Sequence, residues 1–265
     1  MDSFETYKAA QKKGWANFGQ MERETTPCAA RLVKHAGIRA GQRVLDVACG
    51  TGVVSVTATL LGARVTGFDI TPELLARARE NARDAGVEVD WQEGDVEKLP
   101  FGDASFDAVL SQFGHIFAPR PDVAIAEMLR VLKPGGTIAF STWPPELFTG
   151  RMFALTASYL PAPPPGVSTP PLWGDPNIIR QRLGAAVKDI IFDRSTMLVP
   201  ALSPQNRRAV TERAAGPMSR LVAALSESDP EKLAEYRRKH DALASTYFSD
   251  NILRQDYLMT RATKV

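Results

Sequence analysis

The stretch VLDVACGTG, Val44 to Gly52, decides the fold of this chain. Its first half is a short apolar run, which is typical of a strand buried inside a parallel sheet. Its second half holds Gly50 and Gly52, and glycines allow a tight turn and a close approach between backbone and ligand. A helix is predicted from Val53 to Leu61, and its free N–H groups would face the same ligand. Taken alone, the turn could serve a nucleotide, a dinucleotide or no ligand.

Strand-like and helix-like segments alternate from Arg43 to Thr142. Such alternation predicts a parallel sheet with right-handed crossovers and helices on both faces. After the strand at 44–48, further strands are predicted over 64–69, 87–92, 106–111 and 137–142. The helices between them are predicted over 53–61, 71–86 and 121–132.

The pattern changes after Trp143. Residues 161–171, PAPPPGVSTPP, hold six prolines and are predicted to form a stiff extended loop. A strand is predicted over Val187–Leu198, and helices follow over 204–248. Residues Ile252–Thr263 favour a final strand, which could close the sheet in the antiparallel direction.

Two acidic residues follow strands of the predicted sheet. Asp69 ends the second strand, 17 residues after Gly52, where a carboxylate can accept hydrogen bonds from two ribose hydroxyls. Asp95 follows the third strand. Because ligands of open α/β sheets bind outside the carboxyl ends of the strands, we expect these acids and the glycine turn to converge on one site.

These residues resemble the class I S-adenosylmethionine-dependent methyltransferases, and most closely the small-molecule branch of ubiquinone/menaquinone-type enzymes. The resemblance spans roughly residues 40–143 and departs from the family at Ala48, where a glycine is common. It is carried by five motifs in order: VLDVACGTG (44–52), TGFDITPELL (66–75), GDVEKLPF (94–101), SFDAVLSQFG (105–114) and EMLRVLKPGG (127–136).

The resemblance implies an α/β fold of the doubly wound, Rossmann-like kind. Its sheet would have seven strands, mostly parallel, with the last strand antiparallel. Val187–Leu198 would be the sixth strand and Ile252–Thr263 the seventh. The expected domains are an N-terminal helical segment over the cofactor site (1–39), a core (40–203 and 249–265) and an inserted helical cap (204–248).

The resemblance also implies S-adenosyl-L-methionine as the cofactor. The turn formed by Ala48, Gly50, Thr51 and Gly52 would hold its methionine part, and Asp46 would organise that turn.

The remaining cofactor contacts follow from the other motifs. Asp69 would bind the ribose hydroxyls, with Ile70 against the adenine. Asp95 would meet the adenine amino group beside Val96. The list is completed by Ser111 and Gln112, which would face the amino-acid end and the methyl group, and by Trp15, on a segment that family members often fold over the cofactor.

The histidines differ in their positions relative to the predicted site. His115 follows the fourth strand at the ligand edge, so an imidazole there could act as a general base on the acceptor. His240 lies on an apolar helical stripe and is predicted to be a packing residue. Because the three histidines and two cysteines are scattered, no metal site is predicted.

Composition narrows the function further. The 32 basic and 30 acidic residues leave a net charge of +2, which argues against a general nucleic-acid binder. No run of 18 apolar residues is present, so no membrane insertion is predicted. The acidic start and the absence of a disulfide framework favour a cytoplasmic protein. A monomer or a homodimer is expected.

The sequence therefore predicts a methyltransferase that moves a methyl group to an O, N or C atom of a small-molecule acceptor. Two alternatives remain open. One is a non-catalytic protein that binds S-adenosylmethionine. The other is a nicotinamide-dependent oxidoreductase, although such an enzyme would carry a third glycine where Val53, Val54 and Ser55 stand here.

Overall fold

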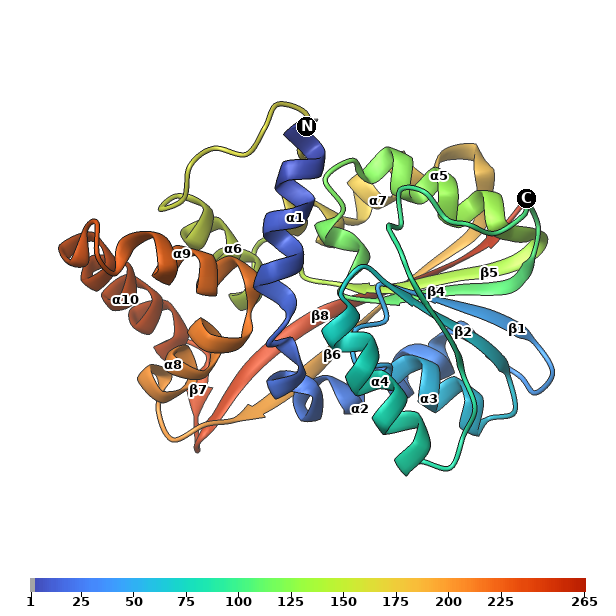
Figure 1. The fold of residues 1–265 in the computed structure, drawn as a ribbon, viewed down its shortest axis with the longest axis horizontal. Helices are drawn as coiled ribbons and strands as arrows, with labels where there is room; N and C mark the ends of the chain where they lie inside the picture. The colour runs from blue at the N-terminus through green and yellow to red at the C-terminus, as the bar shows by residue number, and fades with distance from the viewer. Residues whose placement is uncertain (1–2) are drawn as a thin grey trace.

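The computed structural model, which describes residues 3–265, is organised around one twisted sheet (Figure 1). Within those residues the sheet has eight strands, seven of them in the order β3-β2-β1-β4-β5-β8-β6, with the short β7 paired to β8. The strands are β1 (Arg43–Val47), β2 (Arg64–Asp69), β3 (Asp90–Glu93), β4 (Phe106–Gln112), β5 (Leu132–Thr142), β6 (Val187–Pro200), β7 (Phe248–Ser249) and β8 (Ile252–Lys264).

Strands β1 to β5 pair in parallel, and β8 lies antiparallel between β5 and β6. The predicted Rossmann-like sheet with an antiparallel last strand is therefore confirmed, and the two-residue β7 is an addition to it. Two strand boundaries differ from the prediction by three residues or more. β3 begins at Asp90 instead of Val87, and β5 begins at Leu132 because its first residues pair with Phe106 before a register shift.

Alternating side chains of the central strands enter two separate cores. Leu45 and Val47 of β1 belong to a cluster with Met128, whereas Val44 belongs to a cluster with Leu32 and Ala58. Because both faces of the sheet are covered there, the central strands β1 and β4 are largely apolar runs and not alternating ones. The covering helices are α2 (Glu22–Ala36), α3 (Val53–Leu60) and α4 (Pro72–Asp84) on one face, and α5 (Pro121–Val131) and α7 (Pro176–Leu183) on the other.

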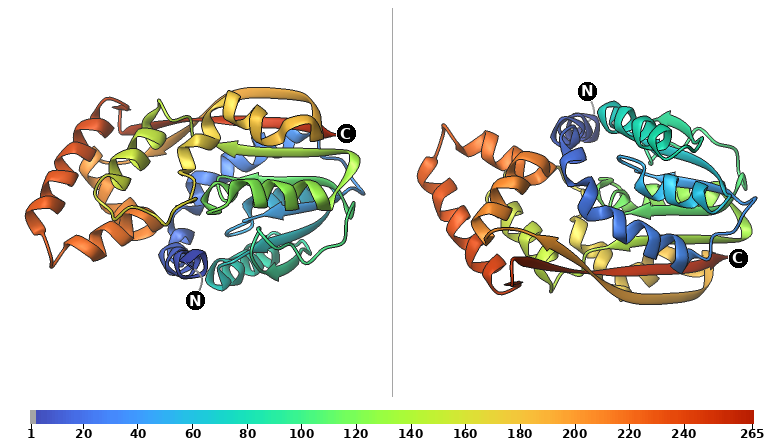
Figure 2. Two further views of the ribbon diagram at one scale, coloured as in Figure 1. Left: turned by 90° about the horizontal axis from the view of Figure 1, so that it is seen from above. Right: turned by 90° about the horizontal axis from the view of Figure 1, so that it is seen from below.

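A second helical group stands beyond the carboxyl end of the sheet (Figure 2). Three of its helices lie between β6 and β7 in the chain: α8 (Pro204–Ala214), α9 (Gly216–Leu225) and α10 (Pro230–Ser245). The fourth, α6 (Phe148–Ala157), follows β5 and packs against α9 and α10. We call these four helices the cap. Helices α6, α9 and α10 share a small core of their own, built from Met152, Tyr159, Met218, Leu221, Leu225, Leu233 and Tyr236.

The N-terminal helix α1 (Ser3–Trp15) lies between the cap and the sheet and packs against α9 (Figures 1 and 2). The predicted extended loop ends in a 3₁₀ helix, Pro170–Gly174, which carries the fully buried Trp173 into the main core. No helix within residues 3–265 combines the length and apolarity needed to cross a membrane.

Truncation of the cap core should destabilise the protein. Leu221 is fully buried, so Leu221→Ala should lower the free energy of unfolding by about 2–5 kcal/mol, through lost apolar contacts and a residual cavity. Urea denaturation followed by circular dichroism measures the change. The matched control is Leu202→Ala, where the side chain is 80 % exposed and the expected change is below about 0.5 kcal/mol. Equal effects of the two substitutions would contradict a packed cap.

Candidate functional site

One large cavity opens at the carboxyl ends of β1, β2 and β4. It encloses about 1590 Å³ of non-atom space, with its open mouth included. Its walls come from the turns after these strands, from α1 and the 3₁₀ helix Phe18–Met21, and from the cap. The predicted convergence of the glycine turn and the acids is therefore seen, at the position where open α/β sheets bind ligands.

The glycine turn presents Gly50 to the cavity. Gly50 has φ +56° and no atom within 4 Å of the place where a Cβ would stand, so its backbone is open to a ligand. Gly52 has φ +78°, but a Cβ there would meet the Trp91 ring at 2.4 Å. Gly52 therefore lets α3 and β3 pack closely and lies behind the cavity wall, whereas the family resemblance assigned it to the cofactor contact.

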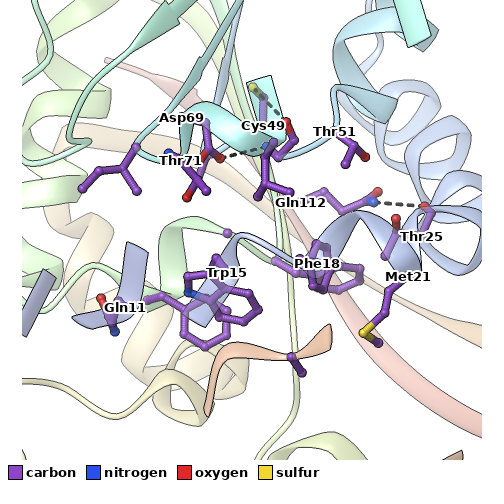
Figure 3. A pocket seen from close by; sticks show the side chains of 18 of the residues that line it. Gln11, Trp15, Phe18, Met21, Thr25, Cys49, Thr51, Asp69, Thr71 and Gln112 are labelled. Atoms are coloured by element: carbon purple, nitrogen blue, oxygen red, sulfur yellow. Dashed lines mark hydrogen bonds between the residues drawn. The ribbon is translucent and has the colours of Figure 1, made fainter. Parts of the chain in front are cut away.

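Asp69 ties the turn after β1 to the turn after β2. Its Oδ2 accepts the Gly50 N–H at 2.8 Å, and its Oδ1 accepts the Thr71 N–H at 2.8 Å. Figure 3 shows the carboxylate facing the cavity beside Thr71 and Cys49. Burial raises the pKa of Asp69, although the backbone N–H groups oppose that shift by stabilising the anion.

Asp46 is the second buried carboxylate in the wall. Its Oδ2 accepts the Ser55 hydroxyl at 2.6 Å, and its Oδ1 has no hydrogen-bond partner among the described residues. Burial, with a smaller contribution from the charge of Asp69, raises the pKa of Asp46 to about 7, although the hydrogen bonds from Ser55 oppose the shift. An unpaired buried oxygen is costly, so this atom is suited to a positively charged or donating ligand group.

Asp95 is held by a lysine that the sequence analysis did not single out. Lys8 of α1 is 6 % exposed, and its Nζ lies 2.5 Å from Asp95 Oδ2 and 2.7 Å from Glu97 Oε2. Burial disfavours the ammonium ion, but hydrogen bonds to Asp95 and Glu97 outweigh it and raise the pKa of Lys8. This ion cluster fixes α1 across the mouth of the cavity. Glu97 stands in the motif GDVEKLPF, but no local signal links that motif to residue 8.

An aromatic group from the N-terminal segment closes the side opposite the acids (Figure 3). The Trp15 ring lies 5.4 Å from the Phe18 ring and 4.5 Å from the Phe117 ring, measured between centroids. Ile70 and Val96 line the wall nearer the acids. The cavity therefore has a polar edge along the strand ends and an apolar, aromatic floor.

The residues at the end of β4 divide between cavity and core. Gln112 lines the cavity, donates from Nε2 to the Thr25 carbonyl at 3.0 Å, and leaves Oε1 without a partner in the part of the chain described. Ser111 points the other way. It is fully buried and donates to the Val47 carbonyl at 2.7 Å, so the structure places it in the sheet and not in the predicted methyl-facing position.

The predicted base His115 is placed inside the core. It starts a 3₁₀ helix, His115–Phe117, that turns the ring onto Phe140 and Trp173 at 4.8 Å and 4.7 Å between centroids. Burial, with a smaller contribution from Arg182, lowers its pKa to about 3. The ring lies outside the wall of the cavity, so the geometry does not support a role for His115 as base.

The cap supplies cavity residues that sequence reasoning missed. His240 of α10, predicted to be a packing residue, borders the cavity together with Thr149 of α6, Arg207 of α8 and Gln255 of β8. Each of these side chains is less than 10 % exposed. For the three residues on helices the periodicity marks only a buried face, and Gln255 lies on a strand, so no local signal separates the four from ordinary core residues.

The comparisons with known proteins agree with this architecture. A family model described as a methyltransferase domain matches residues 45–140. An uncharacterised protein of Mycobacterium bovis is 37 % identical over 90 % of this chain and 87 % of its own length. The ubiquinone/menaquinone biosynthesis C-methyltransferase of Rubrivivax gelatinosus is 44 % identical over 42 % of this chain and 45 % of that protein.

Similarity of fold extends over almost the whole chain. A solved Bacillus halodurans structure, described as a candidate methyltransferase, superposes with a TM-score of 0.62 at 20 % identity and covers 89 % of this chain and 98 % of its own. The chain belongs to the class I S-adenosylmethionine-dependent methyltransferase family. Its cofactor is accordingly S-adenosyl-L-methionine, which confirms the sequence prediction.

Ala48 carries backbone strain at the start of the turn. It has φ +51°, in the left-handed region that costs a residue with a Cβ about 1–2 kcal/mol. Ala48→Gly should therefore raise the free energy of unfolding by about 1 kcal/mol, as measured by urea denaturation. The control is Ala154→Gly on the exposed side of α6, which should lower it by about 1 kcal/mol. A destabilised Ala48→Gly variant would contradict the strain argument.

The Lys8 ion cluster should control the docking of α1. Lys8→Met leaves the Asp95 and Glu97 carboxylates without their shared cation, so amide hydrogen exchange in residues 5–15 should become at least about tenfold faster. Lys13→Met, at an exposed position on the same helix, should leave the exchange unchanged. Equal protection in both variants would show that α1 is held by its apolar contacts alone.

Proposed function

We propose that the protein transfers a methyl group from S-adenosylmethionine to a small, largely apolar acceptor. The observation that carries the proposal is the continuity of the cavity. The same enclosed space meets the Gly50 turn and the acids at one end and the apolar side chains of the cap at the other. A donor and an acceptor bound in it would lie next to each other.

The residues present fit the methionine part of the cofactor. Gly50 leaves its backbone open, and Thr51 lines the wall beside it. Asp46 Oδ1 and Gln112 Oε1 are acceptors without protein partners within residues 3–265. An α-ammonium group offers the donors that such oxygens need. We assign this end of the cavity, with Ala48 at its start, to the methionine part.

The acids after β2 and β3 suit the nucleoside part. Each Asp69 oxygen uses one acceptor site on a backbone N–H, and a carboxylate oxygen has a second for a ribose hydroxyl. Ile70 and Val96 provide an apolar contact for the adenine ring. Asp95 is assigned to the adenine amino group, and its ion pair with Lys8 couples that contact to the docking of α1.

Catalysis in this arrangement depends on alignment. The bound cofactor supplies an electrophilic methyl group on a positively charged sulfur. The chain's contribution is to hold donor and acceptor in line and to exclude water, and orientation of this kind can supply about 7–11 kcal/mol of barrier lowering. Trp15 and the cap helices would provide the exclusion. With His115 in the core, no base at the end of β4 is part of the proposal.

The enclosed, apolar acceptor end supports a small molecule over a polymer. Trp143, Phe148, Met152, Phe153 and Met197 line it. Burying their surface against an apolar ligand provides binding energy, and binding pockets for small organic molecules are typically lined in this way.

Asp69 tests the cofactor assignment. Asp69→Asn keeps the size of the side chain but removes its charge, so the affinity for S-adenosylhomocysteine should fall about 10- to 100-fold. Isothermal titration calorimetry measures the change, and Asp107→Asn is the control because Asp107 pairs with Lys133 at the other end of β4. Unchanged affinity in Asp69→Asn, or tight binding of NADH by the wild type, would contradict the proposal.

Asp46 should make cofactor binding depend on pH. In the free protein its pKa is about 7, so below that pH it is mainly protonated. The ammonium group of S-adenosylhomocysteine favours the carboxylate, so binding lowers this pKa and releases a proton. The affinity should therefore rise as the pH increases toward 7 and level off above it. Calorimetry between about pH 5.5 and about pH 8.5 tests this.

Asp46→Asn is the control. Its side chain cannot ionise, so most of the pH dependence of the affinity for S-adenosylhomocysteine should disappear. Asp69, whose pKa is also raised by burial, is unchanged in that variant and accounts for any remaining slope. A wild-type affinity that falls as the pH approaches 7 would contradict the assignment of Asp46 to the ammonium end.

A further inference from the structure

Three buried polar side chains line the apolar end of the cavity. His240 comes from α10, Thr149 from α6 and Gln255 from β8, and their exposed fractions are 1 %, 5 % and 6 %. The Phe148 and Tyr236 rings flank His240 at 6.1 Å and 6.0 Å between centroids. Polar groups in such surroundings are costly without partners.

This group lies away from the end assigned to the transferred methyl. Gln112, at that end, is level with Ser141 in the β4–β5 ladder. Thr142 of β5 pairs with Leu258 of β8, and β8 continues outward past it. Gln255 precedes Leu258 by three residues in β8, so it lies roughly 10 Å beyond the end of β5. An acceptor reaching Gln255 from the methyl end would have to be elongated.

The three side chains leave both hydrogen-bond donors and acceptors for a ligand. The Thr149 hydroxyl donates to Gln255 Oε1 at 3.2 Å and so orients the Gln255 amide, whose Nε2 group is a hydrogen-bond donor. His240 Nδ1 lies 3.6 Å from Asp241 Oδ1, too far for a hydrogen bond, and has no partner among residues 3–265. Because Nδ1 is buried and His240 borders the cavity, Nε2 is the ring nitrogen left to meet a ligand there.

The charges around His240 are already paired with one another. Arg208 binds Asp241 at 2.8 Å and Glu212 at 2.9 Å, so the ring faces a compensated group from α8 and α10. Burial, opposed by Asp241, lowers the pKa of His240. A neutral imidazole has one donor and one acceptor nitrogen, and together with the Gln255 amide it matches a hydroxyl group, which both donates and accepts.

We propose that His240 and Gln255 recognise a hydroxyl group at the end of an elongated, largely apolar acceptor, remote from the atom that is methylated. Phe148, Met152 and Met197 contact the apolar body of that acceptor. The proposal rests on the proposed function, because the acceptor reaches this end only if the donor occupies the other. His240 is thus a specificity-determining residue and not the base of the reaction.

Two pairs of probes test the proposal in protein saturated with S-adenosylhomocysteine. Each pair compares an aromatic diol, with hydroxyls at opposite ends, with its mono-hydroxyl counterpart: naphthalenediol with naphthol, and dihydroxybiphenyl with phenylphenol. Wild-type protein should bind the diol of at least one pair about tenfold more tightly, as measured by calorimetry. His240→Leu should remove this preference, and His240→Gln, which retains hydrogen-bonding groups, should restore part of it.

His115→Leu is the matched control, because it removes a buried histidine outside the cavity and should leave the diol preference unchanged. Equal binding of diol and mono-hydroxyl probes by the wild type would overturn the proposal. So would an equal loss of both in His240→Leu, which would place the residue against the acceptor body. Failure to bind S-adenosylhomocysteine at all would instead contradict the proposed function, so the two failures are distinguishable.

Discussion

The site depends on one buried carboxylate that joins two chain turns. Asp69 accepts backbone N–H groups from Gly50 and from Thr71, and so links the loop after β1 to the loop that begins α4. The neighbouring Cys49 N–H donates to the Phe68 carbonyl at 3.1 Å and extends the parallel ladder into the turn. With both loops fixed to one side chain, the open backbone of Gly50 keeps its position at the mouth of the cavity.

A second constraint acts from outside the sheet. The Lys8 ammonium group holds α1 against Asp95 and Glu97, and α1 in turn packs against the cap. Removing one charge from a buried ion cluster lowers the stability of the folded protein. These contacts therefore hold α1 in one position over the sheet. The enclosed cavity is therefore a product of three separate parts of the chain. Water exclusion during methyl transfer would depend on all three.

Much of the core could be predicted because its signals are local. Strands β1, β2 and β4 are covered on both faces, and such strands are continuous apolar runs in the sequence. The Gly50 turn and Asp69 also follow directly from their place after a strand. The start of β3 has no such local signal, because three of the four residues of this edge strand, Asp90–Glu93, are polar and its boundary depends on pairing with β2.

The histidines show where local reasoning fails. His115 stands at a strand end, but Trp173 from the proline-rich segment fixes its ring in the core, and nothing near residue 115 indicates that contact. His240 lies on an apolar helical face, and its place at the cavity depends on the packing of α10 against α6. Helix α6 belongs to the cap because it packs against α9 and α10, which are far from it in the sequence. Lys8 is likewise far in the sequence from Asp95 and Glu97, its partners in the ion cluster.

The central claim is that the cavity at the carboxyl edge of the sheet holds the methyl donor. A crystal structure of the protein with S-adenosylhomocysteine tests it most directly. We expect the ligand to extend from the Gly50 turn to Asp95, with its ribose hydroxyls within hydrogen-bond distance of Asp69 and Trp15 covering it. A ligand bound elsewhere, or a ribose that does not contact Asp69, would contradict the account.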